Sequence, residues 1–132
     1  MNELLEKLID IERVMSSKKG DFSLFALFFR EDAPDKWDLV VSAPWIESDK
    51  KRALDSIAKQ LQSNLEPEEL LSLSKIVLVD QDDPALRAIH NAVRILHGTV
   101  EVRDSRFFGL SIKHAYVITS QKQSEPVATS AG

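Results

Sequence analysis

Apolar residues recur every three or four positions over residues 2–17, and this spacing predicts an amphipathic helix. The Lys-Lys-Gly run at residues 18–20 follows it, and a basic last turn with a glycine stop is typical of a helix end. The same period predicts a second helix from Ser48, as its N-cap, to about Leu65. Two further helices are expected: one over residues 68–73, opened by Pro67, and one over residues 84–96, with Pro84 at its first position.

Residues 22–29 are apolar at both alternating sets of positions, which predicts a strand covered on both faces and therefore central in its sheet. A short charged turn leads to residues 37–43, which we expect to form its antiparallel partner. Residues 75–80 predict a third strand. The last two strands are expected at residues 99–103 and 107–119, with Gly109 marking a bulge and the final strand half-exposed.

This order, α-β-β-α-(α)-β-α-β-β, predicts an α/β fold of the α+β type, with helices packed on one mixed sheet of about five strands. A chain of 132 residues can bury one sizeable core. We expect residues 1–119 to form a single globular domain. Residues 120–132 have little apolar content and predict a disordered tail.

The composition narrows the class of protein. The chain has no cysteine, which excludes disulfide frameworks and thiolate metal sites and fits a cytoplasmic location. No apolar run approaches the roughly 18 residues that span a bilayer, so no membrane partner is expected. The net charge of -4 argues against a nucleic-acid partner, although residues 84–132 hold six Lys or Arg against three Asp or Glu and leave open a basic face.

Carboxylates follow the third predicted strand at Asp80, Asp82 and Asp83. Ligands of open α/β sheets bind beyond the carboxyl ends of strands, so Asp80 and Asp82 are candidate ligands for Mg²⁺ or Mn²⁺. The structural alternative is that residues just before Pro84 cap the following helix. Under that alternative only Asp80 lacks a structural role.

A second acidic pattern joins Pro34-Asp35 to Glu101-Val102-Arg103, with Asp38 nearby. It resembles the motif of the PD-(D/E)xK nucleases, in which acidic residues hold a divalent metal and a lysine helps to activate water. The chain departs from that motif because Arg103 stands at the lysine position, and arginine cannot give up its proton. The resemblance implies a metal-dependent phosphoesterase or nuclease that uses Asp35 or Asp38 with Asp80 and Glu101.

The histidines allow one more catalytic hypothesis. His90 and His97 lie seven positions apart on one predicted helix, about 10.5 Å along its axis, which is too far for both to bind one ion. His114 shares a strand face with apolar residues and is expected to be a hydrogen-bonded boundary residue. If His114 meets Asp80 or Glu101 in space, the two form an acid/base pair.

Two segments are candidate interfaces. Trp45 and Ile46 follow the strand-ending Pro44, where they either anchor a partner or fold back onto the next helix. The final strand, with Lys113, Ala115 and Val117 on its more polar face, could pair as an edge with a symmetry mate.

No glycine-rich loop suited to nucleotide phosphates is present, and no cofactor is expected. The leading hypothesis is a cytoplasmic, non-catalytic protein-interaction module that self-associates as a homodimer and binds a further protein. The alternative is the divalent-metal-dependent phosphoesterase or nuclease.

Overall fold

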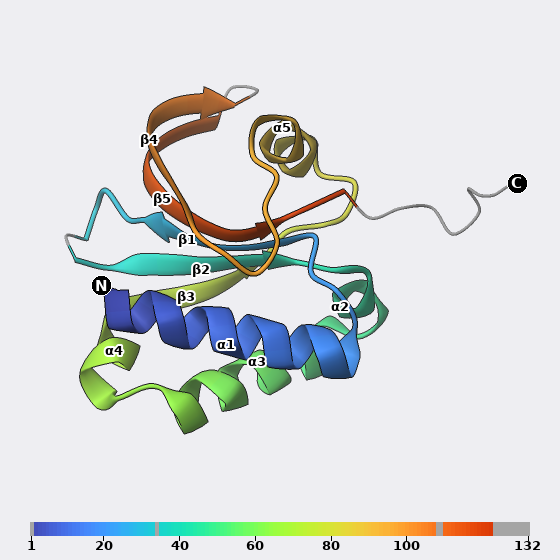
Figure 1. Ribbon diagram of the computed structural model, residues 1–132, viewed down its shortest axis with the longest axis vertical. Coiled ribbons are helices and arrows are strands. Elements are labelled where there is room, and N and C mark those ends of the chain that lie inside the picture. Colours follow the sequence, from blue (N-terminus) through green and yellow to red (C-terminus); the bar gives the residue numbers. More distant parts are fainter. Residues whose placement is uncertain (1, 34, 108–109, 123–132) are drawn as a thin grey trace, which may run out of the picture.

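The computed structural model describes residues 2–33, 35–107 and 110–122 (Figure 1). Five helices and five strands are formed in this part of the chain. The helices are α1 (Asn2–Lys19), α2 (Pro44–Ser48), α3 (Lys50–Asn64), α4 (Pro67–Leu71) and α5 (Pro84–Ala92). The strands are β1 (Leu24–Phe29), β2 (Trp37–Ser42), β3 (Leu73–Leu78), β4 (Val100–Phe107) and β5 (Leu110–Ser120).

The five strands form one mixed sheet in the order β3-β2-β1-β5-β4. Strands β2 and β3 are parallel and are connected through α2, α3 and α4, whereas the other neighbours pair antiparallel. This confirms the predicted α+β fold and the β1–β2 hairpin at its centre. The prediction that the final strand is an edge is wrong, because β5 lies between β1 and β4.

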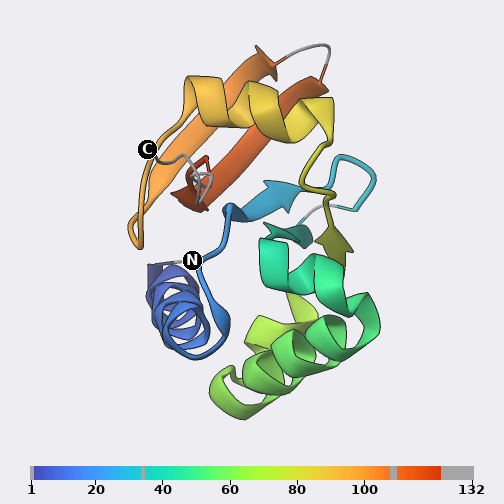
Figure 2. The same ribbon diagram turned by 90° about the vertical axis from the view of Figure 1, so that its right-hand side faces the viewer.

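Helices cover both faces of the sheet (Figures 1 and 2). Helices α1 to α4 lie on one face, and α5 lies on the other, where β4 and β5 bend around it. Alternation along β1 explains the two cores: Phe25 and Leu27 belong to the first, and Leu24 and Ala26 belong to the second. All four side chains are fully buried, as the apolar run predicted.

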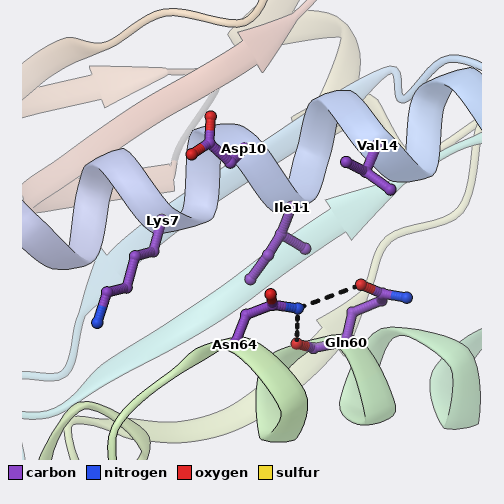
Figure 3. A pocket seen from close by; sticks show the side chains of 6 residues that line it. All are labelled: Lys7, Asp10, Ile11, Val14, Gln60 and Asn64. Carbon is purple, nitrogen blue, oxygen red and sulfur yellow. Dashed lines mark hydrogen bonds between the residues drawn. The ribbon is translucent and has the colours of Figure 1, made fainter.

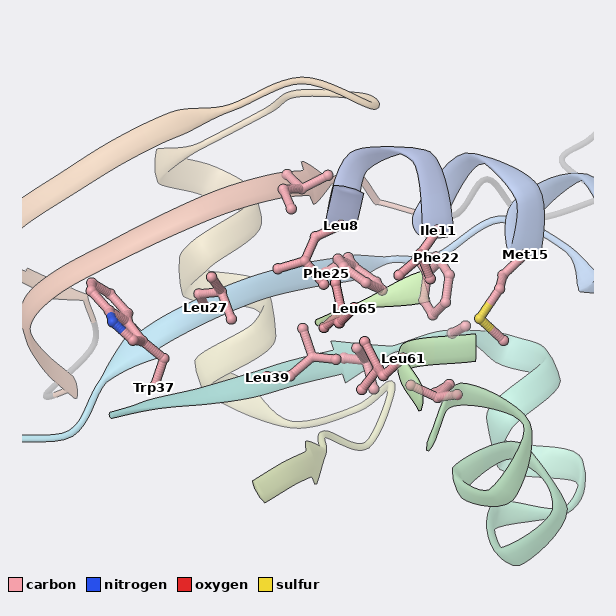
Figure 4. Packing of buried hydrophobic residues seen from close by; sticks show 14 of the residues in the cluster. Leu8, Ile11, Met15, Phe22, Phe25, Leu27, Trp37, Leu39, Leu61 and Leu65 are labelled. Atoms are coloured by element: carbon pink, nitrogen blue, oxygen red, sulfur yellow. The ribbon is translucent and has the colours of Figure 1, made fainter. Parts of the chain in front are cut away.

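The larger core joins the sheet to α1 and α3 (Figure 4). Leu8, Ile11 and Met15 of α1 pack towards Phe22 and Phe25, which confirms the predicted apolar stripe of the first helix. Burial of each such side chain contributes about 1.5–3 kcal/mol, so this layer is the main source of the fold's stability.

The helix predicted from Ser48 to Leu65 is α3, which runs from Lys50 to Asn64, and the short helix α2 precedes it. Pro44 does not leave a loop behind it but begins the short α2, and Asp49, not Ser48, caps α3 by accepting a hydrogen bond from the Arg52 backbone N–H at 3.1 Å. The proline fits the first turn of a helix because that position needs no N–H donor.

Helix α5 is shorter than predicted. It ends at Ala92 because Val93 is extended and Ile95 forms a bridge with Ser120 of β5. Leu96, at the end of the predicted helix 84–96, lies beyond α5 and is 53% exposed. His90 lies in the helix and His97 lies beyond it, so the predicted spacing of the two on one helix is wrong.

Ser120 does not belong to the predicted tail of residues 120–132, because it is part of β5. Ser120 is buried at the end of β5, and its hydroxyl donates to the Val93 carbonyl at 2.6 Å. The predicted disorder of residues 123–132 and the predicted bulge at Gly109 lie outside the described residues. In the part of the chain that the structure describes, no helix combines the length and the apolar character needed to cross a membrane.

Candidate functional site

The candidate metal ligands lie in separate parts of the sheet. Asp35 is in the β1–β2 turn, and Asp38 faces Lys75 at the start of β2. Asp80 follows the opposite end of β3, where its Oδ1 accepts from Lys50 Nζ at 2.8 Å, and Glu101 is on β4 at the far edge. Over residues 2–33, 35–107 and 110–122, no three His, Asp or Glu side chains are close enough to hold one ion. The hypothesis of a shared Mg²⁺ or Mn²⁺ site needs these carboxylates to lie close together, and in the described part of the chain they do not.

Asp82 and Asp83 have different roles in the structure. The Asp83 side chain accepts from the Ala85 backbone N–H at 2.8 Å and caps α5, which is the structural alternative considered above. Asp82 is exposed and lines a cleft beside α5. Asp80 is held by Lys50, so Asp80 and Asp82 do not form a common pair of ligands.

His114 and Glu101 do meet. His114 Nε2 lies 2.7 Å from Glu101 Oε2, and Arg103 Nε donates to the same oxygen at 2.7 Å. These hydrogen bonds, that from His114 first and that from Arg103 second, lower the pKa of Glu101 below its ordinary value. The contact between His114 and Glu101 on which the acid/base hypothesis depended is thus present, across β4 and β5.

Aromatic rings surround this pair on the same face of the sheet. The ring of His114 is 5.1 Å from Trp37 and 4.9 Å from Tyr116, and Trp37 lies 5.4 Å from Phe29. Trp37 is only 6% exposed, so His114 rests on a packed surface. These contacts fix the orientation of His114, which we expected to be a hydrogen-bonded residue at the boundary of the core. Its Nε2 is occupied by the hydrogen bond to Glu101.

The predicted interface at Trp45 and Ile46 needs correction. Ile46 is 1% exposed and belongs to the core shared with Ala53 and Ile57. Trp45 is half-buried, with its ring 5.5 Å from Phe22 in an edge-to-face arrangement. Both side chains stabilise the fold because α2 turns them inward, which is the packing alternative rather than the partner anchor.

The predicted interface on the final strand also changes. Ala115 is fully buried, and Val117 is 2% exposed beneath α5. Lys113 alone of the three is exposed. The prediction of a polar face here is wrong because α5 covers this side of β5, and strand alternation does not reveal that cover.

The exposed edge of β3 is a feature that sequence did not identify. Beside it, on the α5 face of the sheet, lies an open apolar groove of about 270 Å³. Phe28, Val40, Val77 and Val79 line the groove, and Asp38 lies at its side. We call the β3 edge with these four apolar residues the β3 surface.

A basic cleft lies on the exposed side of α5. Its volume is about 420 Å³, and its lining includes Arg87, His90, Arg94 and Lys122. These residues belong to the positively charged last third of the sequence, so part of the basic face left open by the charge distribution is formed. The spacing of Arg87 and Arg94 in the sequence is the signal that could have predicted this cleft. The contribution of Lys122 is visible only in the folded structure.

A third groove lies between α1 and α3 (Figure 3). Its volume is about 230 Å³, and its polar groups are largely engaged. Lys7 pairs with Glu69 at 2.8 Å, and Asn64 Nδ2 donates to the backbone and side-chain oxygens of Gln60. This groove is a seam of helix packing.

One further polar cluster is buried and holds the first helix on the sheet. Glu12 of α1 has no exposed surface, and its carboxylate accepts from Thr119 and Ser16. His97 Nδ1 lies 2.5 Å from the other carboxylate oxygen. A carboxylate in the predicted apolar stripe is a signal that sequence analysis overlooked.

No family model matches the chain, and neither the curated proteins nor the solved structures that were searched contain a match.

Proposed function

We propose that this protein is a cytoplasmic, non-catalytic interaction module that forms a homodimer through the edge of β3. The observation that carries the proposal is the contrast between the two edges of the sheet. Strands at the edge of a sheet present unpaired N–H and C=O groups, and proteins protect such edges with charged side chains. The two edges here are not protected equally.

Strand β4 is a guarded edge. Four of its eight residues are charged and exposed, and these are Glu101, Arg103, Asp104 and Arg106. Its backbone is also interrupted by the positive φ of 45° at Asp104. Both features oppose the addition of another strand.

Strand β3 lacks this protection. Lys75 is its only charged residue among six, and its last three residues are Ile76, Val77 and Leu78, all half-buried. Pairing of two β3 edges about a two-fold axis would extend the sheet across the dimer and satisfy the backbone groups of both copies.

The apolar groove of the β3 surface also favours this edge as the dimer interface. Val77 of β3 lines it together with Val40 and Phe28, so a partner lying along β3 covers apolar area as well as forming backbone hydrogen bonds. A further protein partner would then bind the completed dimer.

The test is the oligomeric state, measured by sedimentation velocity over a hundredfold range of protein concentration. We expect a dimer for the unmodified chain and dissociation for Ser74→Lys, because Ser74 is exposed on β3 and a lysine on an edge strand opposes pairing with another strand. Ser105→Lys on β4 is the matched control and should remain dimeric. A monomer at every concentration, or equal dissociation of the two variants, would contradict the proposal.

A further inference from the structure

The exposed side of α5 carries a row of polar groups. Arg87, Asn91 and Arg94 are spaced by four and three positions and line the same cleft. Ile89 and Val93 lie outside this lining and are buried against the sheet. Arg94 follows the helix end, and its Nε donates to the carbonyl of His90 at 3.3 Å, which returns its side chain to the helix.

The third cation of this cleft comes from another element. Lys122 follows β5, and the residues before it are fixed by hydrogen bonds. Ser120 donates to the Val93 carbonyl at 2.6 Å, and the Gln121 backbone N–H donates to the Ser23 carbonyl at 3.0 Å. The end of β5 is therefore held beside α5, which brings Lys122 to the cleft.

The cleft is locally basic in an acidic protein. Three cations, Arg87, Arg94 and Lys122, face one carboxylate, Asp82, so its lining carries a net charge of +2 (three minus one) against -4 for the whole chain. Among the described residues, none of these three cations forms an ion pair, whereas Lys7, Lys50 and Arg103 do. Their charges are thus available to an anion.

His90 forms the inner wall and contributes a neutral ring. It is 8% exposed, and its Nε2 lies 2.9 Å from the Ser23 carbonyl, which can only accept, so the proton is on Nε2. Burial and the positive charges of Arg94 and Lys122 lower its pKa, while the bond to Ser23 opposes this. The Ser23 hydroxyl also hydrogen-bonds the side chain of Gln81, which lines the same cleft.

We propose that this cleft binds a small ligand that carries a phosphate group. The volume of about 420 Å³ lies in the range of small-molecule sites. Arginine presents a planar fork of donors that matches phosphate oxygens, and Arg87 and Arg94 provide two such forks on one face. Asp82 and Asn91 can accept hydrogen bonds from hydroxyl groups of the same ligand, so a sugar phosphate fits better than the bare anion.

The experiment is a titration of the full chain with inorganic phosphate and with glucose 6-phosphate, followed by amide chemical shifts in NMR spectra. We expect saturable shifts at residues of α5 and at Lys122 for both probes, with tighter binding of glucose 6-phosphate. The double variant R87Q/R94Q should weaken binding at least about tenfold, since hydrogen bonds between charged groups contribute well over the free energy of one decade.

The matched control is K18Q/K51Q, which removes two exposed cations on α1 and α3 and leaves the cleft intact. It should bind both probes as the unmodified chain does. Asp82→Asn should tighten inorganic phosphate because it removes the opposing charge.

Equal weakening in the two double variants, or no saturable shift with either probe, would overturn the proposal. Binding of single-stranded RNA without binding of either small probe would also overturn it, in favour of a nucleic-acid surface. None of these outcomes depends on the β3 edge, so this site and the proposed dimer stand or fall separately.

Discussion

The hydroxyl of Thr119 on β5 donates a hydrogen bond of 2.8 Å to the carboxylate of Glu12 on α1, although 107 positions separate the two residues. Both side chains are fully buried. The Thr119 hydroxyl also accepts from the backbone N–H of His97 at 3.1 Å, where the backbone has a positive φ of 51°. One hydroxyl therefore connects the first helix, the last strand and the loop before β4.

Thr119→Val is expected to destabilise the protein by about 2 kcal/mol, because a buried carboxylate loses a donor and the His97 N–H loses its acceptor. The shape of the side chain is nearly kept, so the change isolates the hydroxyl. Urea unfolding gives the free energy. Thr119→Ser keeps the hydroxyl and should lose clearly less, and an equal loss in the two variants would show that the methyl group, not the hydrogen bond, matters.

His90 makes the folded state sensitive to mild acid. An unfolded histidine takes up a proton near its ordinary pKa of 6.5, whereas burial lowers the pKa of His90 in the fold. Between pH 6.5 and the lower folded pKa the unfolded chain binds more protons, so stability is complete above pH 6.5 and declines on acidification below it.

The check is the urea midpoint of the unmodified chain and of His90→Gln at a series of pH values from about 7.5 to 5. Glutamine retains a donor for the Ser23 carbonyl and does not titrate, so the variant should show a flatter dependence. The same slope in both proteins would assign the acid sensitivity to other groups.

Gly20 links the end of α1 to β1 with a φ of 124°, a conformation that side-chain-bearing residues rarely adopt. A Cβ at this position would lie 3.2 Å from Cδ1 of Trp45. Gly20→Ala should therefore cost about 1–3 kcal/mol and alter the near-ultraviolet circular dichroism of Trp45.

Gly98→Ala is the comparison. There the added Cβ would meet the flexible end of Ile95 at 2.9 Å, without a backbone in the left-handed region. It should be tolerated better than Gly20→Ala. Equal destabilisation would mean that side-chain crowding, rather than φ, sets the cost.

The pKa of Glu101 reports on its two partners separately. Because the hydrogen bond from His114 is the largest cause of its lowered pKa, His114→Ala should return that pKa towards its ordinary value more than Arg103→Gln does. Carboxyl carbon chemical shifts measured over acidic pH give both values. The stability that Glu101 contributes is present above its unfolded pKa and declines as pH falls through the folded one, so His114→Ala should also make the protein less sensitive to strong acid. A larger effect of Arg103→Gln would reverse this assignment.

The sequence by itself determined most of the elements and the centre of the sheet. The apolar run around Phe25 requires cover on both faces, and the stripe that includes Leu8 requires a helix lying on that sheet. Local chemistry also fixed the cap at Asp83, since an Asp-Pro pair favours a helix start wherever it lies.

Only the tertiary structure decided where α5 ends and which strand forms an edge. Residues beyond Ala92 keep a helical pattern, but the bridge from Ile95 to Ser120 gives their backbone a partner in the sheet instead. Likewise, the alternation of β5 does not reveal that β4 follows it on the outside, because pairing between strands is a long-range property.

The candidate sites also depend partly on the sequence and partly on the tertiary structure. The sequence contains the carboxylates, the histidines and the cations, but distances between them arise from the order of strands. That order separates Asp38, Asp80 and Glu101, joins Glu101 to His114, and brings Lys122 to Arg94. Periodicity acts over a few residues and determines the elements, whereas a site needs groups from distant elements, which only packing brings together.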